Sequence, residues 1–137
     1  MSEQTTHADA AMDDAAVRIL ASQINMTLEL FDALDEGIAL YRRDGTVVTG
    51  NATARTMVGR TQAELRDAYF TIHLAPGDFA KVLGFYQTLL ATELPVEFDA
   101  NFIHADGTPI PVHVRLLPAR YQGRMVGIYG IAQQTAP

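Results

Sequence analysis

Two Asp-Gly pairs, Asp44-Gly45 and Asp106-Gly107, divide this chain into segments. Each pair lies between β-prone runs. In that setting Asp-Gly is among the strongest sequence signals of a tight hairpin, because both residues tolerate positive φ angles. Residues with helical periodicity fill the stretch between the two pairs. The sequence therefore predicts a hairpin, then helices, then three strands, the last of them over residues 124–133.

The N-terminal segment has a helical pattern after a polar start. Residues 1–13 show no apolar period, so we expect disorder there, and we place a flanking helix over residues 14–35, before Gly37. Its apolar residues recur at steps of three and four: Val17, Leu20, Ile24, Leu28 and Phe31. This stripe fits two interpretations, a helix that covers the domain's own sheet and the seam of a homodimer.

The last predicted strand is apolar on both faces, with Val126 and Ile128 on one and Tyr129 and Ile131 on the other. A strand covered on one side only should alternate more cleanly. We therefore expect the N-terminal helix to cover the second face of the sheet.

Two helix starts are predicted in the middle of the chain. Thr61 with Glu64 has the pattern of a capping box, and Asp78 is a suitable N-cap for a longer helix. That longer helix carries a wide apolar stripe: Phe79, Val82, Leu83, Tyr86, Leu89 and Leu90. Pro95 prevents its continuation.

Composition excludes several classes of function. The net charge of −6, with no basic stripe, argues against binding to nucleic acid or to an anionic membrane surface. The chain has no cysteine, which excludes disulfides, thiolate metal sites, cysteine catalysis and a cysteinyl flavin adduct. It has neither an apolar run of membrane-spanning length nor a secretion signal, so a cytoplasmic location is expected.

With these elements placed, the chain resembles a PAS domain from about Leu30 to Thr135. The segments that carry the resemblance, in chain order, are DEGIALY (35–41), DGTVV (44–48) followed by Asn51, VGRTQAEL (58–65), IHLAPGD (72–78), DGT (106–108) and GIYGI (127–131). Each is weak alone, and their order and spacing together make the match strong.

The resemblance implies an α+β fold over residues 36–135, with a five-stranded antiparallel sheet, helices on one face and the N-terminal helix outside this core. It also implies a sensory or interaction role in signalling, a small molecule between sheet and helices, and output through flanking helices. The family often closes with Asp-Ile-Thr, whereas Gln133-Gln134-Thr135 stands here. We expect the chain to be a fragment of a longer regulatory protein, with an effector domain in the same or another chain.

No catalytic or metal-binding constellation emerges from the residues. His73, His104 and His113 lack the spacing of a metal cluster, and Ser22 has no nucleophile-elbow context. Haem-binding members resemble one another in a histidine on the main helix, and residues 79–90 contain none. His73 is the one candidate haem ligand, although a loop hydrogen bond explains it better. We therefore expect no enzyme and no cofactor other than an unknown small molecule, with haem and flavin both disfavoured.

A small-molecule site is instead predicted where the long helix faces the strands, since such sites are mostly apolar with a few placed polar groups. Its candidate residues are Leu40, Asn51, Tyr69, Phe79, Leu83, Tyr86, Phe98, Phe102, Val114, Ile128 and Gly130. Tyr41 could add a hydroxyl, and Arg55 or Arg115 could meet a ligand carboxylate. The alternative is that the apolar residues fill an ordinary core.

The leading hypothesis is a cytoplasmic sensory domain that binds an apolar or amphipathic molecule and shifts a flanking helix in a homodimer. The alternative is a ligand-free module for dimerisation or protein interaction. Haem or flavin sensing is the third hypothesis.

Overall fold

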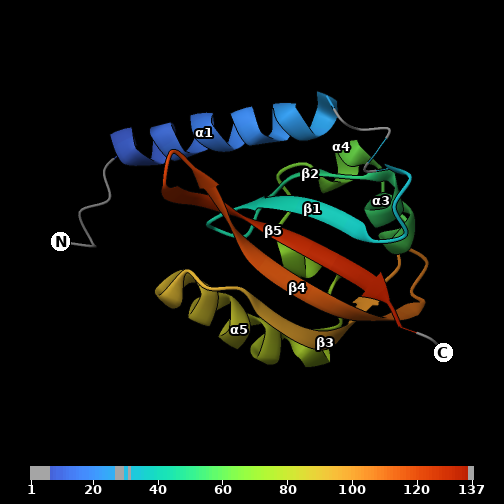
Figure 1. Ribbon diagram of the computed structural model, residues 1–137. Coiled ribbons are helices and arrows are strands. Elements are labelled where there is room, and N and C mark those ends of the chain that lie inside the picture. The colour runs from blue at the N-terminus through green and yellow to red at the C-terminus, as the bar shows by residue number, and fades with distance from the viewer. Residues whose placement is uncertain (1–6, 27–29, 31, 136–137) are drawn as a thin grey trace.

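The computed structural model describes residues 7–26, 30 and 32–135, and the arrangement of their elements is shown in Figure 1. Within the described residues, four α-helices, two short 3-10 helices (η) and five strands have assigned bounds. In chain order they are α1 (His7–Met26), β1 (Gly37–Arg42), β2 (Val47–Gly50), α3 (Ala52–Val58), α4 (Gln62–Leu65), η2 (Phe70–His73), η3 (Pro76–Asp78), α5 (Phe79–Thr92), β3 (Val96–Ile103), β4 (Pro109–Tyr121) and β5 (Arg124–Gln134).

The strands form one antiparallel sheet in the order β2-β1-β5-β4-β3. The predicted α+β fold with a five-stranded antiparallel sheet is confirmed. β5 lies at the centre of the sheet, which explains why its sequence is apolar on both faces. None of the described helices is both long and apolar enough to cross a membrane.

Both Asp-Gly turns lie where the sequence predicts them, and they are built alike. In the first, Asp44 Oδ1 accepts a hydrogen bond of 2.9 Å from the backbone N–H of Thr46. In the second, Asp106 Oδ1 accepts one of 2.9 Å from Thr108. Both glycines have φ +92°, whereas neither aspartate has a positive φ. The turns therefore need the conformational freedom of glycine at one position only.

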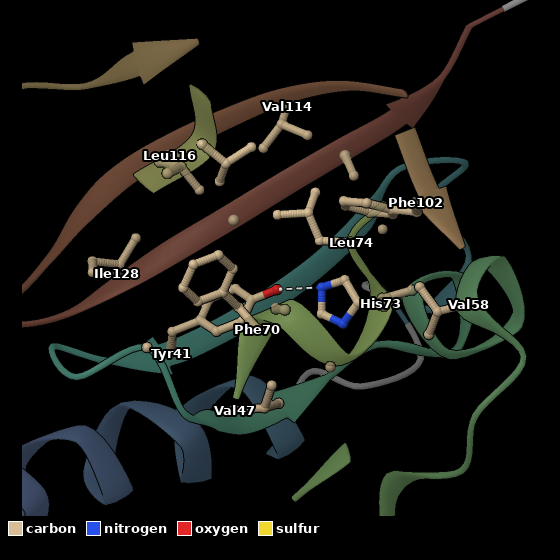
Figure 2. A pocket seen from close by; sticks show the side chains of 18 of the residues that line it. Tyr41, Val47, Val58, Phe70, His73, Leu74, Phe102, Val114, Leu116 and Ile128 are labelled. Carbon is tan, nitrogen blue, oxygen red and sulfur yellow. Dashed lines mark hydrogen bonds between the residues drawn. The ribbon is translucent and has the colours of Figure 1, made fainter. Parts of the chain in front are cut away.

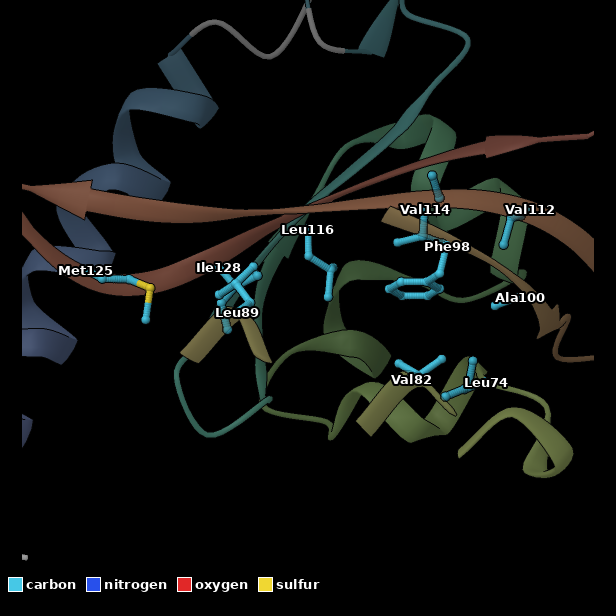
Figure 3. Close-up of a cluster of buried hydrophobic side chains, with 11 residues drawn as sticks. Leu74, Val82, Leu89, Phe98, Ala100, Val112, Val114, Leu116, Met125 and Ile128 are labelled. Atoms are coloured by element: carbon cyan, nitrogen blue, oxygen red, sulfur yellow. The ribbon is translucent and has the colours of Figure 1, made fainter. Parts of the chain in front are cut away.

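One face of the sheet packs against α5 and the short helices, and Figure 3 shows this cluster. Val82 and Leu89 of α5 are buried there, and the Phe85 ring stacks on the Phe98 ring of β3 with centroids 4.9 Å apart. Phe79 and Leu83, which the sequence places in the buried stripe, are 38% and 43% exposed. The wide stripe fits more than one rotation of the helix, and contact with β3 and β4 selects the rotation.

α1 covers the opposite face of the sheet, as the sequence predicts (Figure 1). Val17 and Leu20 are buried with Leu40 of β1 and Val126 of β5. α1 and β1 both come close to the backbone of Gly127. A Cβ added at Gly127 would lie 2.5 Å from the Tyr41 carbonyl oxygen and 3.1 Å from Val17 Cγ2. At Val17 and Leu20 the apolar stripe of α1 therefore packs on the chain's own sheet. Leu28, Phe31 and the side chain of Ile24 lie outside the described residues.

The start of α1 differs from the prediction of disorder over residues 1–13, because the helix begins at His7. Ion pairs with the sheet hold its first half. Asp13 pairs with Arg124 of β5 at 2.5 Å, and Asp14 pairs with Arg42 of β1 at 2.9 Å. These partners are distant in sequence, so the apolar period alone could not reveal them.

Candidate functional site

A cavity of about 80 Å³ lies between the inner face of the sheet and the helices that cover it (Figure 2). Its walls come from β1, β2 and α3 to α5, with β3, β4 and β5 completing the enclosure. The residues that line it are Gly37, Ala39, Tyr41, Gly45, Val47, Gly50, Ala54, Met57, Val58, Leu65, Phe70, His73, Leu74, Val82, Tyr86, Phe98, Phe102, Val114, Leu116, Ile128, Gly130 and Ala132.

Small residues on two paired strands leave room for the cavity. Gly37 pairs with Ala132, and Ala39 pairs with Gly130, across β1 and β5. All four line the cavity, and together they remove bulk from adjacent positions of the sheet. The ring of Tyr41 occupies part of this space, because a Cβ at Gly130 would lie 3.0 Å from Tyr41 Cε2. The missing side chain at Gly130 therefore makes room for Tyr41 as well as for the cavity.

A Tyr–His pair supplies most of the polarity of the cavity. The Tyr41 hydroxyl and His73 Nε2 share a hydrogen bond of 3.3 Å, drawn as a dashed line in Figure 2. The His73 ring also meets Phe102 edge-on, with centroids 5.0 Å apart. Burial, helped by the positive charge of Arg60, lowers the pKa of His73 to about 4, so this imidazole is neutral at pH 7. Burial also raises the pKa of Tyr41, which keeps its hydroxyl protonated.

Three buried polar atoms near this site have no hydrogen-bond partner in the part of the chain that the structure describes. They are His73 Nδ1, Tyr86 Oη and Arg60 Nε. The first two belong to residues that line the cavity. An unpaired buried polar group costs about 1–3 kcal/mol, so a molecule that satisfies one of these atoms gains affinity.

Six of the predicted ligand-site residues line the cavity: Tyr86, Phe98, Phe102, Val114, Ile128 and Gly130. The prediction placed Leu40, Asn51, Tyr69, Phe79 and Leu83 beside them, and the structure places those five elsewhere.

Leu40 lies on the other face of the sheet, packed beneath α1. The inward positions of β1 are Gly37, Ala39 and Tyr41, so strand alternation turns Leu40 outward. The sequence shows this alternation, but it does not show which face meets which helix.

Asn51 is buried for a structural reason. Its Oδ1 accepts hydrogen bonds of 2.9 Å from the backbone N–H groups of Ile38 and Ala54, and its Nδ2 donates to the Glu36 carbonyl at 3.1 Å. It thereby caps α3 and fixes the start of β1.

The other three predicted residues are partly exposed. Tyr69 is 51% exposed, and Phe79 and Leu83 lie on the outer side of α5.

The two arginines considered for a ligand carboxylate also lie away from the cavity lining. Arg55 donates to the Gly50 carbonyl at 2.6 Å, and Arg115 pairs with Glu36 at 3.4 Å on the outer side of the sheet. Neither arginine is therefore placed to meet a carboxylate within this cavity.

Sequence reasoning missed the contributions of His73, Phe70 and Leu74, which come from η2 and the residue after it. The segment 68–76 has apolar anchors but no regular period, so its inward side chains could not be assigned. Gly37, Ala39, Gly130 and Ala132 are a signal of the cavity that can be read in the sequence. Along residues 37–40 and 129–132, small and large side chains alternate, so the small ones share one face of the sheet.

The cavity as it stands is smaller than the larger cofactors of the third hypothesis require. Pockets that enclose drug-sized ligands measure about 300–1,000 Å³, well above the volume found here. A haem or flavin ring system would require displacement of the lining side chains. As a separate point, no group of three or more His, Asp or Glu side chains among the described residues is arranged to hold a free metal ion.

Comparison with known proteins agrees with this architecture. A family model described as the PAS fold matches residues 31–136, more than half of the chain. No curated protein matches the sequence.

Three solved structures illustrate the likeness of fold. A PAS domain from Colwellia psychrerythraea has a TM-score of 0.74 at 17% identity and covers 82% of this chain and 96% of its own. A domain of a sensory box sensor histidine kinase/response regulator from Geobacter sulfurreducens has a TM-score of 0.68 at 18% identity, with coverages of 84% and 96%. A LOV protein from Rhodobacter sphaeroides has a TM-score of 0.71 at 14% identity, with coverages of 83% and 67%.

Proposed function

The chain belongs to the PAS fold family, and from that premise we propose that it is a sensory domain of a signal-transduction protein. It binds a small apolar or amphipathic molecule between the sheet and the helices, and it has no catalytic role of its own. The protein acts in the cytoplasm, and its effector domain lies in the same or another chain. A regulatory role suits its similarity to a domain of a sensor histidine kinase/response regulator.

The observation that carries this proposal is the cavity itself. Protein interiors are normally packed as densely as organic crystals. Here Gly37, Ala39, Gly130 and Ala132 leave a gap on two adjacent strands, and buried polar atoms beside it have no partner among the residues that the structure describes. Both features fit a site that gains a molecule.

Transmission to α1 is the second part of the proposal, and it uses neighbouring residues of β1. Tyr41 faces the cavity, and Arg42 faces α1. Arg42 Nε donates to Asp14 Oδ1 of α1 at 2.9 Å, and its Nη1 donates to Asp67 Oδ1 at 3.0 Å in the segment after α4. The hydrogen bond from Arg42 is the main reason that the pKa of Asp14 is lowered. A molecule that moves Tyr41 would therefore change the attachment of α1.

Arg42→Gln tests this attachment. We expect the variant to lose about 1 kcal/mol of local stability in α1, because a partly buried, charge-assisted pair is broken. Backbone amides of α1 should then exchange with deuterium about fivefold faster. The matched control is Arg18→Gln, since Arg18 also pairs with Asp14, but it does so from within the same helix and its side chain is largely exposed. Equal exchange rates in the two variants would show that Arg42 does not transmit a change in the cavity to α1.

Homodimer formation is the third part. Because Val17 and Leu20 pack on the chain's own sheet, the contact between protomers uses the other side of α1, where Met12 and Ile19 are exposed. The ligand-free dimerisation module remains the alternative function, and it would use the same side of the helix.

Native mass spectrometry of the purified chain, followed by solvent extraction, tests ligand binding. We expect a small molecule to be retained by the wild type and by Ile38→Val, but not by Ala39→Val. The two substitutions lie on adjacent residues of β1, and only Ala39 lines the cavity, where the added methyl groups take up its space. A bare mass in all three proteins, without thermal shift across a metabolite panel, would favour the ligand-free module.

A further inference from the structure

We propose that the molecule held in this cavity is compact and uncharged, and that its hydrogen-bonding group bonds Nδ1 of His73. This inference rests on the proposed ligand-binding function and specifies the chemical class of the ligand. The class is that of short amides, ketones and alcohols, with a small apolar portion and one polar group.

The charge of the ligand follows from the lining of the cavity. Tyr41, His73 and Tyr86 are the residues with a polar hydroxyl or imidazole among those that line it, and the lining includes no Asp, Glu, Lys or Arg. His73 is neutral at pH 7, as burial lowers its pKa to about 4. A carboxylate or ammonium group would therefore be buried without an opposite charge, which is strongly unfavourable.

Arg60 offers the one competing interpretation. Its positive charge contributes to the low pKa of His73, and its Nε is buried without a partner among the described residues. Arg60 is not part of the cavity lining, however. An anion in the cavity would therefore have no positive charge in the lining to meet, whereas an uncharged ligand needs only the free nitrogen.

The position of the polar group follows from hydrogen bonds already made. His73 Nε2 and the Tyr41 hydroxyl are engaged with each other at 3.3 Å, which leaves two polar atoms of the lining without a partner among the described residues, His73 Nδ1 and Tyr86 Oη. We assign the ligand bond to Nδ1 because His73 is the more deeply buried of the two side chains. Figure 2 shows this second nitrogen on another edge of the ring, with no hydrogen bond drawn to it. His73 is only 6% exposed, so bulk water cannot serve Nδ1 freely. An amide, which both donates and accepts, suits either tautomer of the ring.

The size of the ligand follows from the volume. A dry cavity of about 150 Å³ in another protein holds benzene, and the present cavity measures about 80 Å³. The ligand therefore has fewer non-hydrogen atoms than benzene. Next to Gly37, Ala39, Gly130 and Ala132, its apolar portion meets small side chains and backbone.

Three probes of matched size test the inference: acetamide, acetate and xenon. Each is titrated into the full chain while NMR follows the cavity methyl groups of Val114, Leu116 and Ile128, together with the ¹⁵N shifts of the His73 ring. We expect acetamide to bind at least about tenfold more tightly than acetate, because only acetate carries a charge into the apolar site. The Nδ1 shift should move with acetamide and stay constant with xenon.

The matched variant is the double substitution Tyr41→Phe with His73→Leu, which removes both partners of the hydrogen bond, so that neither is left unpaired by the loss of the other. We expect it to bind xenon as the wild type does and to lose at least about tenfold in affinity for acetamide. If the double variant does not fold, the comparison of acetamide with acetate and the Nδ1 shift in the wild type decide the question.

The outcomes separate this inference from the function beneath it. Tighter binding of acetate than of acetamide would indicate that the ligand is an anion that pairs with Arg60, and it would overturn the inference. Binding of xenon with no preference for acetamide would also overturn it, while leaving a ligand cavity in place. Binding of none of the three would remove the cavity as a ligand site and, with it, the proposed function.

Discussion

Val17→Asp should lower the free energy of unfolding by on the order of 4 kcal/mol, because it buries an unpaired carboxylate. Val17 is 0% exposed and lies where α1 approaches Gly127 most closely. Urea denaturation followed by circular dichroism measures the loss, with the m-value as a check that the unfolding transition is unchanged.

Ile19→Asp is the matched control for that substitution. It introduces the same charge two residues along the same helix, at a position that is 42% exposed. At protein concentrations where the chain is monomeric, we expect it to change the free energy of unfolding by less than about 0.5 kcal/mol, as surface substitutions usually do. Equal stabilities of the two variants would show that α1 is not docked on the sheet in solution.

The same pair of variants addresses the proposed dimer. Light scattering coupled to size-exclusion chromatography gives the mass of each protein. If the protomers meet through the exposed side of α1, Ile19→Asp should shift the mass towards the monomer while the fold remains intact. A wild type that is monomeric at all concentrations would contradict this part of the proposal.

Acidification should destabilise the protein through His73, by about 3 kcal/mol between pH 7 and pH 4. Its pKa is about 4 in the folded state and 6.5 in the reference state. Between these values the unfolded chain binds a proton that the folded chain does not, so stability is fully present above pH 6.5 and falls as the pH drops towards 4. Urea denaturation across this range, compared with the double variant Tyr41→Phe with His73→Leu, isolates the contribution of His73 from that of the carboxylates.

A parallel pH dependence of the wild type and the double variant would contradict this expectation. It would mean that His73 is accessible to solvent, and the cavity would then be open. The measurement therefore also tests whether the Tyr41–His73 pair is sealed from water.

Local signals predicted the order of elements well. The Asp-Gly turns, the capping box of Thr61 with Glu64, and the alternation of β1 and β5 are all present in the structure. Each depends on residues within a few positions of one another, and the preferences of the backbone and of short side chains suffice to fix it. Asp78 is the exception, because its carboxylate accepts from the Asn101 N–H in β3 instead of capping α5.

The candidate site was predicted only in part, because it depends on contacts between residues that are far apart in the sequence. Phe98, Val114 and Ile128 were found because strand alternation places them inward. Leu40 and Leu83 were misplaced because periodicity groups residues on one face without saying what that face meets. His73 was found as a residue but not as part of a cavity, since its partner Tyr41 is 32 residues away in sequence.

The positions of the turns, the segments that form strands or helices, and the need for a helix over a sheet that is apolar on both sides all follow from the order of the residues. The face of β1 that meets α1, the rotation of α5, and the grouping of small residues of β1 and β5 beside a neutral histidine depend on how the elements pack. Turns and periods arise from neighbouring residues, whereas a cavity is the space left between side chains that are distant in sequence. That space depends on how whole elements pack against one another.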